Sequence, residues 1–196
     1  YVNKQHAKAR PKMNKTQDWQ AHWLEDDYQN HKQAVFELID NYLNPAPTKS
    51  LEIGCGLALD SEYFYKKYNT DIWLLDGNET NARDIKYGSA ETFAFYNTIE
   101  SLKESYDSRN LKYKFVDANN IKLGDEKFDL IFSLKSCGFH YPLDTYYELI
   151  KNHSTKETRL IFELRNNSAL GQLSKFEVVE TIQQRKKSSI FELKLK

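Results

Sequence analysis

Short apolar runs alternate with longer amphipathic stretches along most of the chain. Parallel strands joined by crossover helices produce such an alternation, because each strand is buried on both faces and each helix on one. The apolar runs predict strands at 50–53, 72–75, 113–116, 128–133 and 160–164. Helices are predicted at about 60–68, in the second half of the long connection 77–111, and after Pro142. The pattern therefore predicts an α/β fold built on a doubly wound sheet.

The carboxyl-terminal end departs from this alternation. Two β-rich runs, 176–182 and 189–193, flank the charged segment 183–187. Two strands around one short charged loop predict a β-hairpin. The hairpin brings the expected number of strands to seven.

The amino-terminal end divides into two further segments. Residues 1–15 contain five Lys and Arg residues, no acidic residue and the helix-breaking Pro11, so we expect a flexible, solvated basic arm there. Residues 16–47 carry apolar side chains at helical spacing and end at two prolines, which predicts N-terminal helices. Residues 48–196 are expected to form one α/β domain.

The composition narrows the range of partners. The 28 Lys and Arg residues balance the 28 Asp and Glu residues, so no net field attracts nucleic acid, and we expect a small-molecule substrate instead. Cys55 and Cys137 lie in apolar segments, unlike a disulfide framework or a metal cluster. No apolar run approaches the roughly 20 residues of a bilayer span, and the start lacks the order of a signal peptide. We expect a cytoplasmic protein without a metal or a membrane partner; the oligomeric state is left open.

Two glycines follow the first predicted strand, in the run Leu51-Glu52-Ile53-Gly54-Cys55-Gly56. At the carboxyl end of a strand in such a sheet, glycine lets a ligand approach the backbone closely. The dinucleotide fingerprint would need a third glycine where Leu59 stands. Glu52 would also repel a pyrophosphate, whereas it suits a positively charged ligand.

The run from Glu52 to Ala58 resembles the acid-x-Gly-x-Gly-x-Gly motif of class I S-adenosylmethionine-dependent methyltransferases, with Ala58 replacing the last glycine. In that family an acid after the second strand binds the ribose hydroxyls, matched here by Asp76. A polar residue after the third strand meets the adenine amino group, matched by Asp117. The strand that ends at Ser133 resembles the family strand leading to the methyl-transfer site.

The resemblance extends from about residue 33 to the carboxyl end. It implies a sheet in the order 3-2-1-4-5-7-6 with the last strand antiparallel, and S-adenosylmethionine as the cofactor. The implied cofactor-binding residues are Glu52, Gly54, Gly56, Asp76, Gly77, Asp117, Ala118 and Ser133. The alternative interpretation is structural: a glycine turn, a helix-capping Asp76 and an Asp117 in an ordinary loop.

The segment after the fourth strand, 133–142, would face the acceptor. It lacks the Asn/Asp-Pro-Pro-Tyr signature of methyltransferases that act on amino groups of bases. His140 is the candidate general base, because imidazole titrates near neutral pH and can take a hydroxyl proton. A structural histidine beside Pro142 is the equal alternative.

Other residues are weaker candidates. Lys135 is expected to orient an acidic substrate group, and Glu163 and Arg165 to contact polar groups of the acceptor, with solvated surface roles as the alternative. For Trp19, Trp23 and Tyr28, packing on the sheet is favoured over folding across the cofactor.

These observations predict methyl transfer to a hydroxyl of a small polar molecule, with a sugar as the first candidate. One alternative is an RNA or protein methyltransferase that uses the basic arm and the segment 185–187. Others are a non-catalytic cofactor-binding module and a reaction of the cofactor itself, since fold alone does not settle the reaction.

Overall fold

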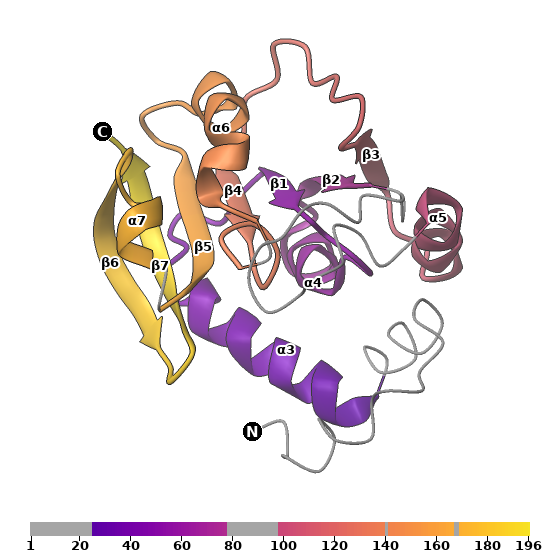
Figure 1. Cartoon of the computed structure of the whole chain (residues 1–196). Coiled ribbons are helices and arrows are strands. Elements are labelled where there is room, and N and C mark those ends of the chain that lie inside the picture. The colour runs from indigo at the N-terminus through magenta and orange to yellow at the C-terminus, as the bar shows by residue number, and fades with distance from the viewer. Residues whose placement is uncertain (1–24, 78–97, 140, 167–168) are drawn as a thin grey trace, which may run out of the picture.

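A single seven-stranded sheet organises the chain (Figure 1). The computed structural model describes residues 25–77, 98–139, 141–166 and 169–196. The strands lie in the order β3-β2-β1-β4-β5-β7-β6. Their bounds are β1 Lys49–Ile53, β2 Asp71–Asp76, β3 Tyr113–Asp117, β4 Leu130–Ser133, β5 Arg159–Arg165, β6 Phe176–Gln184 and β7 Ser188–Leu195.

The first five strands are parallel, whereas β7 is antiparallel to both β5 and β6. The predicted order and the antiparallel edge hairpin are therefore confirmed. Predicted and observed strand ends differ by one or two residues. At β4, the amide of Phe128 donates to the carbonyl of His153 (3.1 Å), so the ladder begins two residues later than the apolar run.

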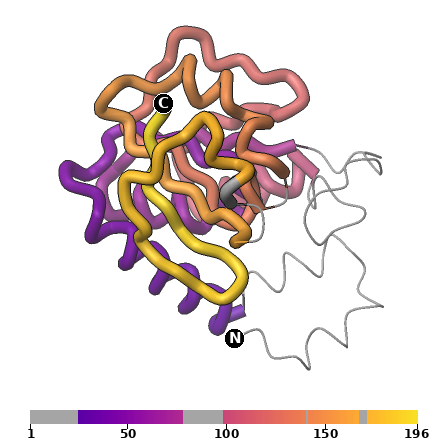
Figure 2. The backbone as a smooth tube through the Cα atoms, turned by 60° about the vertical axis from the view of Figure 1, so that its left-hand side comes forward, coloured from indigo at the N-terminus to yellow at the C-terminus, as the bar shows by residue number. Residues whose placement is uncertain are grey.

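Helices cover both faces of the sheet (Figures 1 and 2). Their bounds are α3 Asp26–Asp40, α4 Leu59–Tyr68, α5 Ile99–Ser108, the 3-10 turn Leu143–Tyr146, α6 Tyr147–His153 and α7 Ala169–Gln172. The helix predicted in the second half of the 77–111 connection is α5. The predicted arm 1–15 and the part of that connection from 78 to 97 lie outside the described residues.

Alternating strand residues form two layers of core. On one face, Leu51, Ile53 and Phe162 pack with Ile150 of α6. On the other face, α3 and α4 pack over Phe132 and Ile161, and α5 packs over β2. This two-sided burial explains the continuous apolar runs.

Helix α3 belongs to this second layer. Its Val35, Phe36 and Ile39 pack in one cluster with Ile182 of β6 and Ile190 of β7. Figure 2 shows the β6–β7 hairpin running alongside the helix. The helix therefore lies across the β4–β5–β7 half of the sheet. Among the described residues, no helix combines the length and apolar character of a membrane span.

Candidate functional site

The glycine loop follows β1 directly. Gly54, Gly56 and Ala58 all have left-handed backbone conformations, with φ of 71°, 50° and 54°. The amide of Gly54 donates to the carbonyl of Leu75 at 2.7 Å, which turns the chain across the end of β2. A Cβ on Gly54 would lie 1.7 Å from the Oγ of Ser136, so no larger residue fits. The first glycine is thus required by the neighbouring loop as well as by its own φ.

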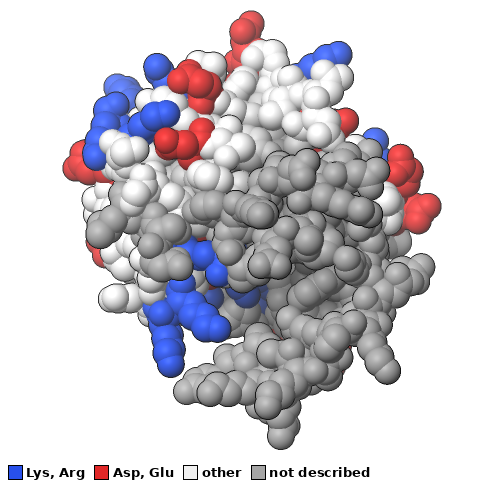
Figure 3. Space-filling view, in the orientation of Figure 1, with Lys and Arg blue, Asp and Glu red and all other residues white. Residues whose placement is uncertain are grey.

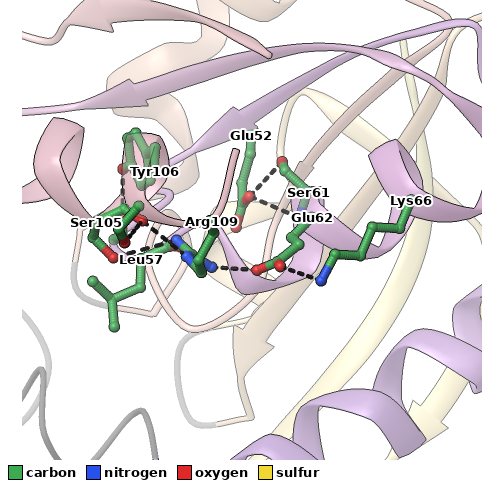
Figure 4. Close-up of polar contacts among 10 residues, drawn as sticks. Glu52, Leu57, Ser61, Glu62, Lys66, Ser105, Tyr106 and Arg109 are labelled. Atoms are coloured by element: carbon green, nitrogen blue, oxygen red, sulfur yellow. Dashed lines mark hydrogen bonds and ion pairs between the residues drawn. The ribbon is translucent and has the colours of Figure 1, made fainter. Parts of the chain in front are cut away.

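Helix α5 holds the carbonyls of this loop (Figure 4). The Tyr106 hydroxyl donates to the carbonyl of Gly56, and the Arg109 guanidinium donates to the carbonyl of Leu57. Arg109 also forms an ion pair with Glu62 of α4. Because Arg109 donates to the loop while it binds α4, it fixes the loop relative to the following helix.

Asp76 at the end of β2 accepts two backbone hydrogen bonds. The amide of Gly56 donates to its Oδ2 at 2.6 Å, and the amide of Gly77 donates to its Oδ1 at 2.8 Å. Burial raises the pKa of Asp76 to about 6, although both hydrogen bonds lower it. A carboxylate has about four acceptor positions. The Cys55 thiol is a third, weak donor, with its Sγ 4.0 Å from Oδ2. Asp76 therefore keeps one free acceptor position and a second that only this weak donor occupies.

Glu52 lies one residue before the end of β1 and is 3% exposed. Its Oε2 accepts from the amide of Ser61 at 3.2 Å and from the Ser61 hydroxyl at 2.6 Å, at the start of α4. Burial raises the pKa of Glu52, and nearby Asp60 raises it further, whereas Lys32 and the two bonds from Ser61 lower it. A positive ligand nearby would favour the ionised form.

Asp117 is paired with Asp76 across the β2–β3 ladder. Its Oδ1 accepts from the amide of Asn119 at 2.8 Å, and the amide of Ala118 donates to the carbonyl of Asp76 at 2.8 Å. The carboxyl ends of three adjacent strands thus bring the glycine loop, Asp76 and Asp117 together. Adenine recognition by Asp117 and Ala118 stays a prediction.

Ser133 at the end of β4 is fully buried. Its hydroxyl donates to the carbonyl of Ile53 at 2.6 Å and accepts from the amide of Cys137 at 2.8 Å. Ser133 therefore ties the loop after β4 to the end of β1. A contact between Ser133 and a cofactor stays a prediction.

The acceptor-side candidates differ in their surroundings. Glu163 is 2% exposed and accepts from the Ser188 hydroxyl at 2.6 Å, so a solvated surface role is wrong for this residue. The Nε of Arg165 donates to the carbonyl of Phe139 at 2.7 Å, and its guanidinium lies 3.9 Å from the Phe139 ring centroid. His140, Trp19 and Trp23 lie outside the described residues.

A buried ion pair between Lys32 and Asp60 was not predicted. Lys32 of α3 is 7% exposed and Asp60 of α4 is 2% exposed. The signal was present in the sequence, because Lys32 stands at helical spacing between the apolar residues Tyr28 and Val35. The part of the chain that the structure describes contains no group of three or more potential metal ligands.

Solved structures with a similar arrangement were found at low sequence identity. PH0226 protein from Pyrococcus horikoshii OT3 has a TM-score of 0.64 at 14% identity, over 88% of this chain and 93% of that one. The ribosomal protein L11 methylase from Lactobacillus delbrueckii subsp. bulgaricus has a TM-score of 0.58 at 12% identity, over 86% and 80%.

The plantazolicin methyltransferase BpumL, solved with a desmethylPZN analog and SAH, has a TM-score of 0.55 at 16% identity. The match covers 85% of this chain, which spans 57% of BpumL. No protein-family model and no curated protein matches the sequence. Strand order, the antiparallel β7 and these likenesses agree on one architecture, and the chain has the fold of the class I S-adenosylmethionine-dependent methyltransferases.

Proposed function

We propose that the protein binds S-adenosylmethionine and transfers its methyl group to a hydroxyl of a small polar molecule. The observation that carries the proposal is Asp76. Its buried carboxylate holds the glycine loop through Gly56, and it keeps one free acceptor position and a second that only the weak Cys55 thiol donor occupies. Two adjacent ribose hydroxyls are donors of this kind. BpumL, a neighbour in fold, was solved with SAH, which supports the same cofactor here.

The other residues at the strand ends fit this cofactor as well. Glu52 lies in β1, two residues before Gly54, and a sulfonium or an ammonium group close to its carboxylate would favour the ionised form. Tyr106 and Arg109 donate hydrogen bonds to the carbonyls of the glycine loop, so the loop is preorganised for a ligand.

S-adenosylmethionine would supply the methyl group from its sulfonium, and the neutral thioether of SAH would be the leaving group. The protein must then position the acceptor and remove its proton. The loop after β4 meets the glycine loop at Ser136 and so borders the place where the acceptor would lie. His140, four positions after Ser136 in the sequence, remains our candidate for the base that takes the hydroxyl proton. A sugar remains the first candidate acceptor.

An RNA acceptor is the second candidate. The tip of the β6–β7 hairpin carries Arg185, Lys186 and Lys187 in sequence, and Figure 3 shows Lys and Arg atoms gathered at the lower left, where that tip lies in Figure 1. Backbone phosphates would be attracted to such a tip. Fold neighbours such as the L11 methylase act on other kinds of acceptor, so the fold does not choose between them.

Calorimetry with SAH tests the proposed cofactor site. We expect Asp76→Ala and Glu52→Ala each to weaken binding, whereas the exposed Asp125→Ala should bind like the wild type. Affinity equal to wild type in both site variants would overturn the site. A protein that binds SAH but forms none from S-adenosylmethionine with any hydroxylated acceptor would be a binding module instead.

The catalytic part needs a separate measurement. His140→Gln should lower turnover while SAH affinity is kept, and full turnover would make His140 a structural residue. Salt-sensitive binding of an RNA oligonucleotide, lost when Lys186 and Lys187 are replaced by Gln, would favour the RNA acceptor.

A further inference from the structure

Lys135 occupies an unusual position immediately after β4. Its φ of 68° is left-handed, a conformation that L side chains rarely adopt, so the surrounding structure must hold it there. The next residue, Ser136, packs against Gly54 of the glycine loop. Lys135 is therefore one residue away from the contact between the two loops.

The side chain of Lys135 extends to helix α3. Its Nζ lies 3.4 Å from the Nε2 of His31 and 5.5 Å from the ring centroid of Tyr28. An ammonium group has no acceptor, so Lys135 donates and the imidazole accepts. Partial burial of the ring, together with Lys135 and Arg185, lowers the pKa of His31 to about 4, so His31 is neutral at pH 7. The pair thus consists of one cation and one neutral ring.

The neighbouring cations are balanced by carboxylates, whereas no described carboxylate pairs with Lys135. Lys32 pairs with Asp60, and the Nη1 of Arg185 lies 3.6 Å from the Oε1 of Glu163. Across residues 25–77, 98–139, 141–166 and 169–196, no carboxylate oxygen lies within 4.0 Å of the Lys135 Nζ. Burial and repulsion from Lys32 and Arg185 lower the pKa of Lys135, although Glu163 and Asp60 oppose this. An anion at this position would relieve the repulsion.

The location matches the acceptor side of the sheet. In doubly wound sheets ligands lie at the carboxyl ends of the strands, and the residues proposed for the cofactor follow β1, β2 and β3. Lys135 follows β4, and α3 covers that half of the sheet. His31 is exposed and Lys135 is half-buried, so the pair is partly open to solvent.

We propose that Lys135 and His31 bind an anionic group of the methyl acceptor, a carboxylate or a phosphate. The acceptor would then be a hydroxylated molecule that also carries an acidic group, as a sugar acid or a sugar phosphate does. The assignment rests on the proposed function, which places an acceptor beside the glycine loop. Within it, Lys135 supplies the charge, and the imidazole of His31 lies beside it as a further polar group for the same ligand.

NMR of the histidine rings at pH 7 tests the site without knowledge of the acceptor. Sodium acetate or inorganic phosphate is added to the protein at constant ionic strength, and sodium chloride is added in a control titration. The His31 signal is identified by its loss in His31→Gln. We expect acetate or phosphate, but not chloride, to move this signal saturably. Whichever anion binds more tightly identifies the acid as a carboxylate or a phosphate.

Matched variants make the test specific. Lys135→Met should weaken anion binding by roughly tenfold or more, since a bond to a charged group is lost. Lys194→Met removes the same charge from an exposed position on β7 and should bind like the wild type. Wild-type titration curves for Lys135→Met, or no saturable movement in the wild type, would overturn the proposal.

The same experiments distinguish two other outcomes: binding of a polyanion at Lys135 and His31, and failure of the proposed cofactor site. A His31 signal that responds to an RNA oligonucleotide but to neither small anion would overturn the proposal in favour of a polyanion surface. Calorimetry with SAH on the same proteins reports on the cofactor site alone. Failure of the wild type to bind SAH would refute the proposed function. The result for the anion site would stand, because the anion titration is read without a cofactor.

Discussion

The substitution Gly54→Ala tests how tightly the glycine loop is held. The new Cβ would lie 1.7 Å from the Oγ and 2.4 Å from the Cβ of Ser136, and it would sit on a backbone with φ of 71°. A side chain in the left-handed region costs about 1–2 kcal/mol. Overpacking a well-packed contact costs about 1–3 kcal/mol more. We therefore expect the free energy of unfolding to fall by roughly 2–5 kcal/mol.

Two other glycines separate these costs. Gly124 has φ of 58° but nothing within 4 Å of an added Cβ, so Gly124→Ala should lose only the first, backbone part. Gly171 has neither a positive φ nor a close neighbour, and Gly171→Ala should be neutral or slightly stabilising. Urea unfolding measures all three, with calorimetry of SAH as the functional readout.

A double variant completes the test. Ser136→Gly removes both clashing atoms, so in the Gly54→Ala background it should restore about 1–3 kcal/mol, measured as the coupling energy of a double-mutant cycle. The reasoning is refuted if Gly54→Ala costs no more than Gly124→Ala, or if the cycle shows no coupling.

Three further predictions concern Asp76, Arg109 and Lys32. Because the pKa of Asp76 is raised from 3.8 to about 6, the free protein should lose stability as pH rises through this range, by up to ~3 kcal/mol relative to Asp76→Asn in urea unfolding. SAH affinity should rise over the same pH range in the wild type but not in Asp76→Asn. A wild-type affinity that does not change with pH would contradict binding of the cofactor by the ionised carboxylate of Asp76. Arg109→Met should lower the free energy of unfolding by about 1–3 kcal/mol and weaken SAH binding, because the loop loses its contact at Leu57. An equal loss of stability and of SAH affinity in the exposed control Lys103→Met would count against a role for this contact. Lys32→Met should cost about 3–5 kcal/mol because Asp60 is left buried without its partner, and adding Asp60→Leu should recover most of it in thermal unfolding.

Much of the fold could be predicted because its signals are local. Two-sided burial makes each parallel strand a continuous apolar run, and the turn after β1 needs glycine within two residues of the strand. The acid at the end of β2, Asp76, follows Gly54 by 22 positions, close to the spacing expected for one strand–helix–strand unit. The sequence therefore predicts Gly54, Asp76 and Asp117 at one edge of the sheet, and the structure has them there.

The remaining contacts could not be predicted because they join residues far apart in the chain. Arg109 reaches Leu57 across 52 positions, and Lys135 reaches His31 across 104. Neither pair leaves a periodic pattern, since only the packing of α5 and α3 on the sheet brings the partners together. Lys32 is the exception, because a charge on an apolar helical stripe is itself a local signal.

The contacts that α5 makes with the glycine loop have an evolutionary consequence. Tyr106 and Arg109 hold the carbonyls of Gly56 and Leu57 from the helix itself. Substitution of either residue would therefore loosen the loop. The evolution of α5 is thus constrained by the shape of a loop that lies 50 and 52 positions earlier in the sequence.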